Sequence, residues 1–262
     1  MSKYNEIYNS SIKDKEGFWK KVSEDIFWYE KPTKILNTEN PPFYKWFEDG
    51  VTNTCYNALD YHIDKGRGEK IAIIYDSPIT NTHKKITYYE LREKVALFAG
   101  ALKKQGVNKK DRVIIYMPMI PEAVIAMLAC GRIGAVHSVV FGGFAANELA
   151  SRIDDSKAKL IVSASCGYEP GRTVEYKPLL DKAIVLAKHK PSKCIIFQRE
   201  KFKANLDSTV DISWEDSLKD VSPADCEKMK GSDYAYILYT SGTTGLPKGI
   251  VRDIAGHIVA LK

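Results

Sequence analysis

The chain has 262 residues and a formal net charge of +6, which is modest for its length and, without a basic block, does not indicate nucleic-acid binding. No apolar run approaches the roughly 18 residues that cross a membrane, and the first residues lack the apolar core of a secretory signal. The five cysteines are widely spaced and odd in number, so they favour neither a disulfide framework nor a zinc site and are typical of a reducing compartment such as the cytoplasm.

Residues 1–65 are predicted to form an aromatic-rich arm. Pro32 and the Pro41-Pro42 pair divide this arm into short pieces. A platform for an aromatic ligand is one interpretation of so many rings, but we expect them to hold an extended arm against a larger body. The rings are Phe18, Trp19, Phe27, Trp28, Tyr29, Phe43, Tyr44, Trp46, Phe47 and Tyr56.

Residues 66–262 show a different pattern, in which short apolar strands alternate with helical segments. The predicted strands are 71–75, 85–88, 113–116, 136–141, 160–163, 194–197 and, as the last one, 237–240. The predicted helices are 88–105, one that starts at Pro121, 145–153 and 178–188. This alternation predicts an α/β fold with a mostly parallel sheet flanked by helices. Ligands of such sheets bind at the carboxyl ends of the strands.

Two of the helices have specific start signals. Thr87 is a predicted N-cap, and Glu90 three residues later completes a capping box; Gly106 follows the expected end of this helix. Pro121 stands at the first position of the next helix, where a missing N–H costs nothing.

Three weaker predictions concern single residues and segments. His137 lies inside an apolar strand and is expected to be a hydrogen-bonded core residue. Residues 200–231, with Trp214 and Cys226, are expected to be a charged surface excursion with a short strand. Near the C-terminus, apolar residues at helical spacing are expected to face a core: Val251, Ile254, Ile258 and Leu261.

The stretch with the clearest chemical content is Tyr239–Gly249, directly after the last predicted strand. Its glycines allow close backbone approach to a ligand, and its hydroxyls and Lys248 suit a phosphate. The pattern predicts a polyphosphate-binding loop rather than a plain polar connector. It does not fit the P-loop of NTPases, because Leu246-Pro247 separates Gly245 from Lys248, and Gly249 stands where Ser or Thr should hold magnesium.

Two shorter stretches are weaker candidates for ligand contact. Phe141-Gly142-Gly143-Phe144 follows a predicted strand and precedes a helix, and its small residues allow a ligand to approach closely. Glu169-Pro170-Gly171-Arg172 offers an arginine that could bind a phosphate. A tight turn and a solvated or carboxylate-paired arginine are the respective alternatives.

The stretch 239–249 resembles the signature loop of the adenylate-forming enzymes, which include the acyl-CoA synthetases. The resemblance covers essentially the whole chain and is most specific in residues 127–144, a run that is similar to the short-chain acyl-CoA synthetases of the acetyl- and propionyl-CoA type. Other similar segments are 18–19, 46–50, 60–62, 86–88 and 116–122. The resemblance implies the N-terminal part of the large adenylation domain of these enzymes.

The resemblance also implies roles for individual residues. In the family the signature loop grips the β- and γ-phosphates of ATP while a carboxylate attacks the α-phosphate, and Lys248 would be the catalytic residue. The ATP-binding residues would be Thr240, Ser241, Gly242, Thr243, Thr244, Gly245 and Lys248. The coenzyme A site would contain Phe141, Gly142, Gly143, Glu169, Pro170, Gly171 and Arg172. The family motif Arg-x-Gly-Arg keeps only its second arginine here, so the grip on the 3′-phosphate would be weaker or shifted.

The implied reaction joins propionate, ATP and coenzyme A into propionyl-CoA, AMP and diphosphate through an acyl-adenylate. Residues 249–257 are more like propionyl-CoA than acetyl-CoA synthetases, and the Glu-Pro-Gly-Arg variant points the same way. Acetyl-CoA synthetase is the first alternative, and a non-catalytic nucleotide- or CoA-binding module is the second.

Several parts of the family pattern have no match in this sequence. They are the adenine and ribose contacts, the acidic magnesium ligand, the acyl pocket and the small C-terminal domain. We therefore expect an incomplete adenylation domain over residues 66–262, inactive by itself, with no metal ligands for the Mg²⁺ that accompanies ATP. We expect small-molecule partners, no nucleic acid and no membrane, and self-association through apolar surface that further sequence would cover.

Overall fold

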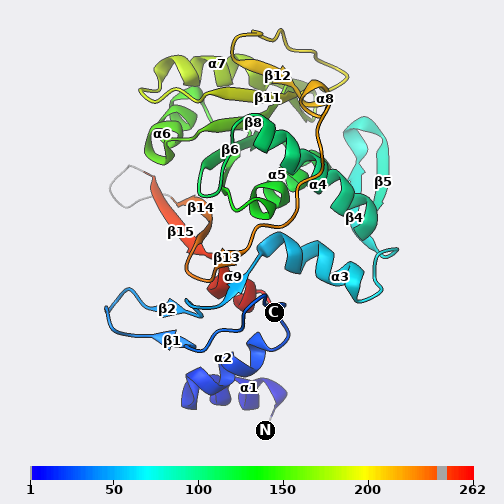
Figure 1. The fold of residues 1–262 in the computed structure, drawn as a ribbon. Helices are drawn as coiled ribbons and strands as arrows, with labels where there is room; N and C mark the ends of the chain where they lie inside the picture. Colours follow the sequence, from blue (N-terminus) through cyan, green and yellow to red (C-terminus); the bar gives the residue numbers. More distant parts are fainter. Residues whose placement is uncertain (1, 241–246) are drawn as a thin grey trace.

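The computed structural model describes residues 2–240 and 247–262. Within these residues the largest element is a seven-stranded sheet in the order β12-β11-β8-β6-β7-β14-β15 (Figure 1). The strands are β6 Arg112–Met117, β7 Val136–Phe141, β8 Leu160–Ala164, β11 Lys193–Phe197, β12 Asp211–Ser213, β14 Tyr234–Thr240 and β15 Lys248–Asp253. All neighbours are parallel except β14 and β15, which are antiparallel. The predicted α/β fold with a mostly parallel sheet is confirmed.

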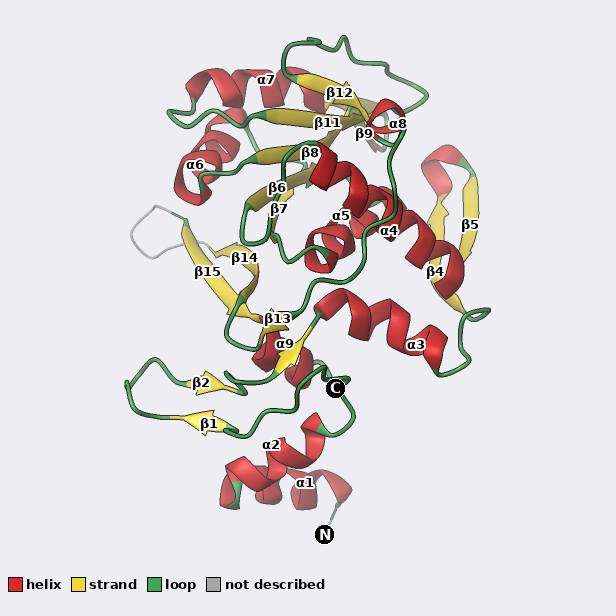
Figure 2. Ribbon diagram, in the orientation of Figure 1, coloured by secondary structure: helices red, strands yellow, loops and turns green. Residues whose placement is uncertain are grey.

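Helices cover both faces of the sheet (Figure 2). On β6, Val113 and Ile115 pack with helices α4 (Tyr88–Lys104) and α5 (Pro121–Arg132). The alternate residues Ile114 and Tyr116 pack with α6 (Ala146–Ser156) and α7 (Tyr176–Leu186). A strand buried on both faces needs an unbroken apolar run, which residues 113–117 supply. Among the described residues, none of the helices is both long and apolar enough to span a membrane.

The two predicted helix starts are present. The Thr87 hydroxyl accepts a hydrogen bond from the Glu90 N–H at 3.2 Å, and the Glu90 carboxylate accepts one from the Thr87 N–H at 2.8 Å, so the capping box of α4 is complete. Pro121 is the first residue of α5. Before α4, strands β4 (Ile71–Ser77) and β5 (Thr82–Thr87) form a hairpin around the short 3-10 helix η2 (Pro78–Thr80).

The first 65 residues form short elements that pack on the end of the chain. These are α1 Lys3–Lys13, α2 Lys15–Ser23, β1 Leu36–Asn37, β2 Lys45–Trp46, β3 Val51–Thr52, the π-helix η1 Tyr56–Asp60 and α3 Tyr61–Asp64. The rings of Trp19, Trp46 and Phe47 pack in one cluster with Ala255 and Val259 of helix α9 (Ile254–Ala260). Aromatic rings therefore join the N-terminal segment to the C-terminal helix, and Figure 1 shows α2 and α9 on the same side of the sheet.

Two predictions about the later part of the chain are wrong. Ile237–Thr240 is not the last strand, because Lys248–Asp253 returns as β15, and Val251 is therefore an exposed strand residue rather than part of a helix. The β-branched pair Ile250-Val251 suits a strand, and pairing with β14 outweighs the helical spacing. Helix α9 buries Ile254 and Ile258 as expected, whereas Leu261 is exposed.

Residues 200–231 contain more core than predicted. Trp214 begins the short helix α8 (Trp214–Ser217) and is buried, with its ring stacked on Phe98 of α4 at 3.8 Å between centroids. The segment then runs over α4 and α5 to strand β13 (Met229–Lys230), which pairs with β3. This segment is therefore a strap across one face of the sheet.

His137 differs from the prediction in its hydrogen bonding. Its Nδ1 atom is buried, and no partner for it is found among the described residues. The ring packs against Tyr236 at 5.6 Å between centroids. Burial lowers the pKa of His137 to about 4, with a further contribution from His257, so the imidazole is neutral at physiological pH.

Candidate functional site at the carboxyl edge of the sheet

The parallel strands all end at the same edge of the sheet, and the predicted site residues follow two of them. Phe141 ends β7, and Thr240 ends the neighbouring strand β14. Because β7 and β14 are adjacent and parallel, the stretch 141–144 and the start of the signature stretch lie beside each other. This is the edge at which open α/β sheets bind their ligands.

The signature stretch forms the connection between β14 and β15. Lys248 is the first residue of β15 and pairs with Thr240, so the chain leaves the sheet at Thr240 and re-enters it directly opposite. Lys248 is exposed and therefore accessible to a ligand. The predicted ATP-binding residues between them, Ser241, Gly242, Thr243, Thr244 and Gly245, lie outside the described residues.

Helix α6 holds the base of this connection. The Tyr239 hydroxyl donates a hydrogen bond to the Asp155 carboxylate at 2.6 Å. Burial and this hydrogen bond raise the pKa of Tyr239, which keeps the phenol protonated. Arg152 lies over the Tyr239 ring at 5.2 Å and over the Phe144 ring at 4.7 Å, so one side chain joins the signature stretch to the 141–144 stretch.

The two glycines of the 141–144 stretch differ in their surroundings. Gly142 is buried, and a Cβ atom placed on it would lie 2.1 Å from the Tyr176 hydroxyl oxygen. Gly143 is exposed, and the three atoms nearest to a Cβ there all belong to the Phe141 ring, which is itself exposed. The space beside Gly142 is therefore filled by the Tyr176 ring and not open to a ligand. Gly143 and Phe141 form the surface that a ligand can reach.

The second predicted coenzyme A stretch is the turn of a hairpin. Strands β9 (Cys166–Glu169) and β10 (Arg172–Glu175) pair antiparallel, with Gly171 at a φ of 78° in the turn. The Arg172 guanidinium forms an ion pair with Glu169 at 2.6 Å, and both side chains are exposed. The hydrogen bond and charge of Glu169 raise the pKa of Arg172 further above its usual value. In the structure Arg172 is therefore paired with a carboxylate, which was the alternative to phosphate binding, and its guanidinium is still open to solvent.

Tyr176 packs between the first stretch and strand β9, which leads into the second, and no sequence pattern pointed to it. Its hydroxyl lies where a Cβ would sit on Gly142 and also where one would sit on Gly167 of β9, at 2.1 and 2.5 Å. The ring packs against Tyr116, whose hydroxyl is 3.1 Å from the Phe144 carbonyl oxygen. The pair of glycines at matched distances from one ring is visible only once the strands are in place.

A separate cavity of about 730 Å³ lies between the β4–β5 hairpin, helices α4 and α5 and the segment after β11. Its walls include Lys84, Lys94, Glu122, Tyr168 and Arg199. Burial raises the pKa of Glu122, and the neighbouring cations oppose the shift. Of the predicted ATP- and coenzyme A-binding residues that the structure describes, none lines this cavity.

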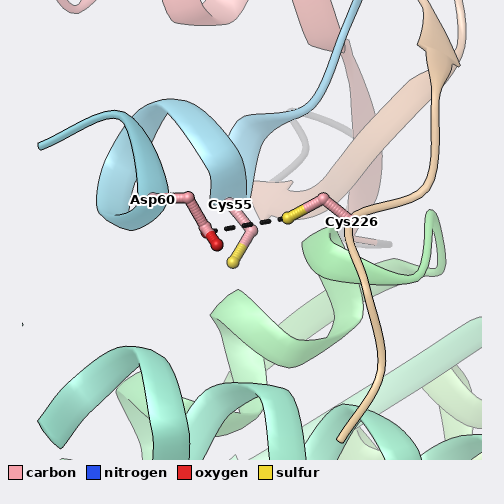
Figure 3. A group of neighbouring side chains, drawn as sticks. All are labelled: Cys55, Asp60 and Cys226. Carbon is pink, nitrogen blue, oxygen red and sulfur yellow. Dashed lines mark hydrogen bonds between the residues drawn. The ribbon is translucent and has the colours of Figure 1, made fainter. Parts of the chain in front are cut away.

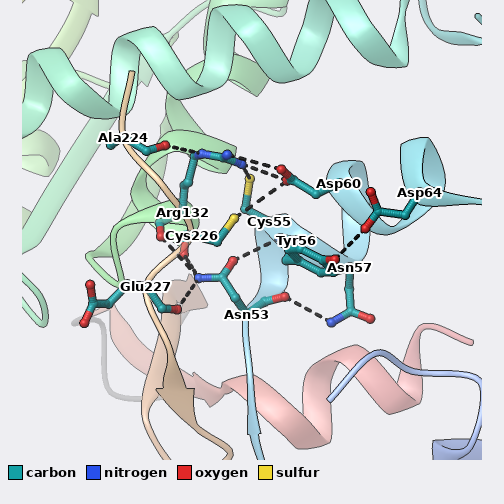
Figure 4. A network of polar contacts seen from close by, with 11 residues as sticks. Asn53, Cys55, Tyr56, Asn57, Asp60, Asp64, Arg132, Ala224, Cys226 and Glu227 are labelled. Carbon is teal, nitrogen blue, oxygen red and sulfur yellow. Dashed lines mark hydrogen bonds and ion pairs between the residues drawn. The ribbon is translucent and has the colours of Figure 1, made fainter. Parts of the chain in front are cut away.

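A second unpredicted group lies where the N-terminal segment meets the strap. Figure 3 shows that Cys55, Asp60 and Cys226 point toward one another, and their Sγ and carboxylate oxygen atoms all lie within 4.8 Å of one another. Figure 4 shows the polar network around them, in which the buried Arg132 binds both carboxylate oxygens of Asp60, at 2.8 and 3.2 Å. The Asn53 amide donates to the carbonyl oxygens of Gly131 and Glu227 in the same network. Residues far apart in sequence make this group, so spacing alone could not reveal it.

Comparison with known proteins gives two family matches. A family model described as AMP-binding enzyme matches residues 61–261, and one described as acetyl-coenzyme A synthetase N-terminus matches residues 4–58. The curated relatives include the acyl-CoA synthetase short-chain family member 3, mitochondrial, of Rattus norvegicus, which is 51% identical over 259 residues. They also include the acetyl-coenzyme A synthetase of Brucella canis, which is 44% identical over 262 residues.

The alignments cover nearly all of this chain but less than half of each relative. The alignments cover 98% of this chain in both cases, but 38% of the rat protein and 40% of the Brucella protein. Among solved structures, acetoacetyl-CoA synthetase from Streptomyces lividans superposes with a TM-score of 0.88 at 25% identity, over 99% of this chain and 40% of that one. The chain thus spans about two fifths of the length of the proteins it matches.

Proposed function

This chain belongs to the AMP-binding enzyme family, and on that premise we propose that it forms the N-terminal part of an AMP-forming short-chain acyl-CoA synthetase. The observation that carries the proposal is the pairing of Thr240 with Lys248 at the carboxyl edge, next to Phe141–Gly143. Phosphate-binding and coenzyme A-binding stretches must lie close together in an enzyme that first forms an acyl-adenylate and then transfers the acyl group to a thiol. The proposed reaction converts a short-chain acid, ATP and coenzyme A into acyl-CoA, AMP and diphosphate.

We propose propionate as the acid, with acetate as the alternative. The support is the sequence of residues 249–257 and the Glu169–Arg172 turn, both of which are closer to propionyl-CoA synthetases. In the structure, residues 249–253 belong to β15 and 254–257 to α9. The substrate preference therefore rests on family likeness, and competition between the two acids in an adenylation assay measures it.

We further propose a division of labour within the chain. Residues 1–65 would be an arm that packs on the body, and residues 66–262 an adenylation region that needs further sequence for activity. The two family matches, to residues 4–58 and 61–261, support this boundary. The thiol chemistry of five unpaired cysteines supports a reducing compartment such as the cytoplasm.

Magnesium accompanies ATP in this kind of chemistry, and the described residues do not offer it a fitting site at the carboxyl edge. The carboxylate next to the signature stretch, Asp155, already accepts the Tyr239 hydroxyl at 2.6 Å. Lys248 and the Thr240 hydroxyl are the described groups that could contact the phosphates of ATP.

Acid-dependent exchange of labelled diphosphate into ATP tests the proposal. A longer protein that contains these 262 residues should catalyse the exchange, and the 262-residue chain alone should not. Lys248→Ala should slow acyl-adenylate formation by roughly 10²-fold while thioester formation from supplied acyl-adenylate changes little, because the lost charge acts on the phosphates. Lys188→Ala, an exposed lysine elsewhere, is the matched control.

The opposite results are equally informative. Exchange by the 262-residue chain would show that the chain is catalytically sufficient. Equal loss in both half-reactions would remove the phosphate role of Lys248. Tight ATP or coenzyme A binding without exchange in the longer protein would favour a non-catalytic binding module.

A further inference from the structure

Cys55 and Cys226 form a thiol pair at the junction between the N-terminal segment and the body. Cys55 immediately precedes η1, and Cys226 lies on the strap between α8 and β13. Their Sγ atoms and the Asp60 carboxylate lie within 4.8 Å of one another (Figure 3). The Cys226 thiol is 3.7 Å from Asp60 Oδ2, to which it can donate a hydrogen bond.

The charge around the pair argues against a metal site. Asp60 already binds the Arg132 guanidinium through both oxygens, and Arg132 Nη1 is also 3.7 Å from Cys55 Sγ (Figure 4). A divalent cation held by the two sulfurs and Asp60 would therefore stand beside a buried, fixed positive charge. A disulfide is uncharged, so the Arg132 guanidinium does not repel it. A guanidinium next to a sulfur also stabilises the negative charge that develops when a thiol reacts.

The scaffold around the pair is already assembled. Asn53 donates to the carbonyl oxygens of Gly131 and Glu227 at 2.9 and 2.8 Å, which fixes the chain two residues before Cys55 and one residue after Cys226. Arg132 also donates from Nε to the Ala224 carbonyl oxygen at 2.6 Å. The two sulfurs, within 4.8 Å of each other, therefore lie on segments that hydrogen bonds already hold together.

We propose that Cys55 and Cys226 form a disulfide when the protein meets a peroxide, and that this bond cross-links the N-terminal segment to the strap. Cys226 is the more accessible thiol and reacts first, since Cys55 is completely buried. Its sulfur attacks a peroxide oxygen, the O–O bond breaks, and a sulfenic acid and one molecule of water or alcohol form. The Cys55 sulfur then attacks the sulfenic sulfur and releases water, so two thiols lose two electrons and two protons in total.

The reaction should be slow at neutral pH. The hydrogen bond with Cys55 and burial raise the pKa of Cys226, so its thiol is protonated, and the thiolate is the reactive form. In a reducing compartment the pair stays reduced, and the cross-link forms only under sustained oxidation. Neither cysteine is among the residues proposed to bind ATP or coenzyme A.

Hydrogen peroxide treatment of the 262-residue chain tests the pair directly. The chain has five cysteines, and the number of free thiols in denaturant should fall by two. A non-reduced peptide map should show one linked pair that contains Cys55 and Cys226, and dithiothreitol should reverse it. The melting temperature of the oxidised chain should rise by on the order of 5 °C, because the bond closes a long loop.

Matched variants separate this outcome from others. Cys226→Ala should abolish the linked peptide and the rise in melting temperature, whereas Cys194→Ala, at a buried cysteine elsewhere, should keep both. Oxidation that stops at sulfinic acid on Cys226 without a linked peptide would overturn the proposal. So would sub-micromolar binding of Zn²⁺ that protects both thiols, since the group would then be a metal site. The wild-type map is decisive even where a variant fails to fold.

Discussion

Tyr176 packs against a glycine of the first candidate coenzyme A stretch and against a glycine of β9, the strand that leads into the second stretch. Its hydroxyl fills the space that a Cβ on Gly142 or Gly167 would need, and its ring packs against Tyr116. A fully packed contact of this kind tolerates no extra methyl group without a shift of backbone or ring. The glycine at position 142 is thus required by packing, while the exposed Gly143 is free to meet a ligand.

Gly142→Ala should therefore destabilise the chain by about 1–3 kcal/mol, the usual cost of overpacking. Gly143→Ala is the matched control, because the atoms nearest to its new methyl belong to the exposed Phe141 ring, which can turn away. Urea denaturation followed by circular dichroism measures both. Equal stability of the two variants would contradict the packing role of Tyr176.

Arg172 supports a different prediction, because its guanidinium is exposed and paired with Glu169. If Arg172 binds the 3′-phosphate of coenzyme A, the carboxylate must share or release it. In a longer active protein, Arg172→Ala should raise the KM for coenzyme A on the order of tenfold, with little change for dephospho-coenzyme A or ATP. Glu169→Gln should lower the KM for coenzyme A. Equal effects on coenzyme A and dephospho-coenzyme A would show that Arg172 acts only on the hairpin.

Local sequence patterns predicted the ends of helices correctly, whereas features that depend on contacts between distant segments were not predicted. The capping box of α4 and the proline that starts α5 are encoded within four residues of each helix end, so the sequence alone revealed both. The strand β15 was missed because its pairing with β14, rather than its own pattern, decides its conformation. Likewise, the alternation of strands and helices predicted a site at the carboxyl edge of the sheet. The contacts of Tyr176 with Gly142 and of Cys55 with Cys226 depend on the assembled fold and were not predicted.

The capping box also predicts a pH effect. Thr87→Ala should destabilise the chain by about 1 kcal/mol at neutral pH, since an N–H at the start of α4 loses its acceptor. The hydrogen bonds from Thr87 lower the pKa of Glu90, so its contribution is present above the ordinary carboxyl pKa and is lost as pH falls through the lowered one. The stability difference between wild type and Glu90→Gln should shrink in acid. A difference that stays constant between neutral pH and pH about 3 would contradict this role.

At the scale of the whole molecule, one face of the sheet is incompletely covered at β7, β14 and β15. Tyr236 pairs with His137, so the residues two positions further along, Leu238 and Val139, share a face, and Ile250 lies opposite Leu238 on β15. These three side chains are 47%, 39% and 41% exposed. An exposed apolar row across three strands that ends in an edge strand favours association with a second copy of the chain.

We therefore expect the 262-residue chain to self-associate through the row formed by Val139, Leu238 and Ile250. Light scattering coupled to size-exclusion chromatography across a dilution series should show a mass above that of the monomer, falling on dilution. Leu238→Lys should shift the equilibrium toward monomer by tenfold or more in dissociation constant, roughly the effect of removing one well-buried apolar contact and leaving a charge. Val185→Lys, at a residue that is 77% exposed on α7, is the control and should change nothing. A chain that remains a monodisperse monomer with a cooperative melt at every concentration would show that this face is stable in water, and the row would then have no role in association.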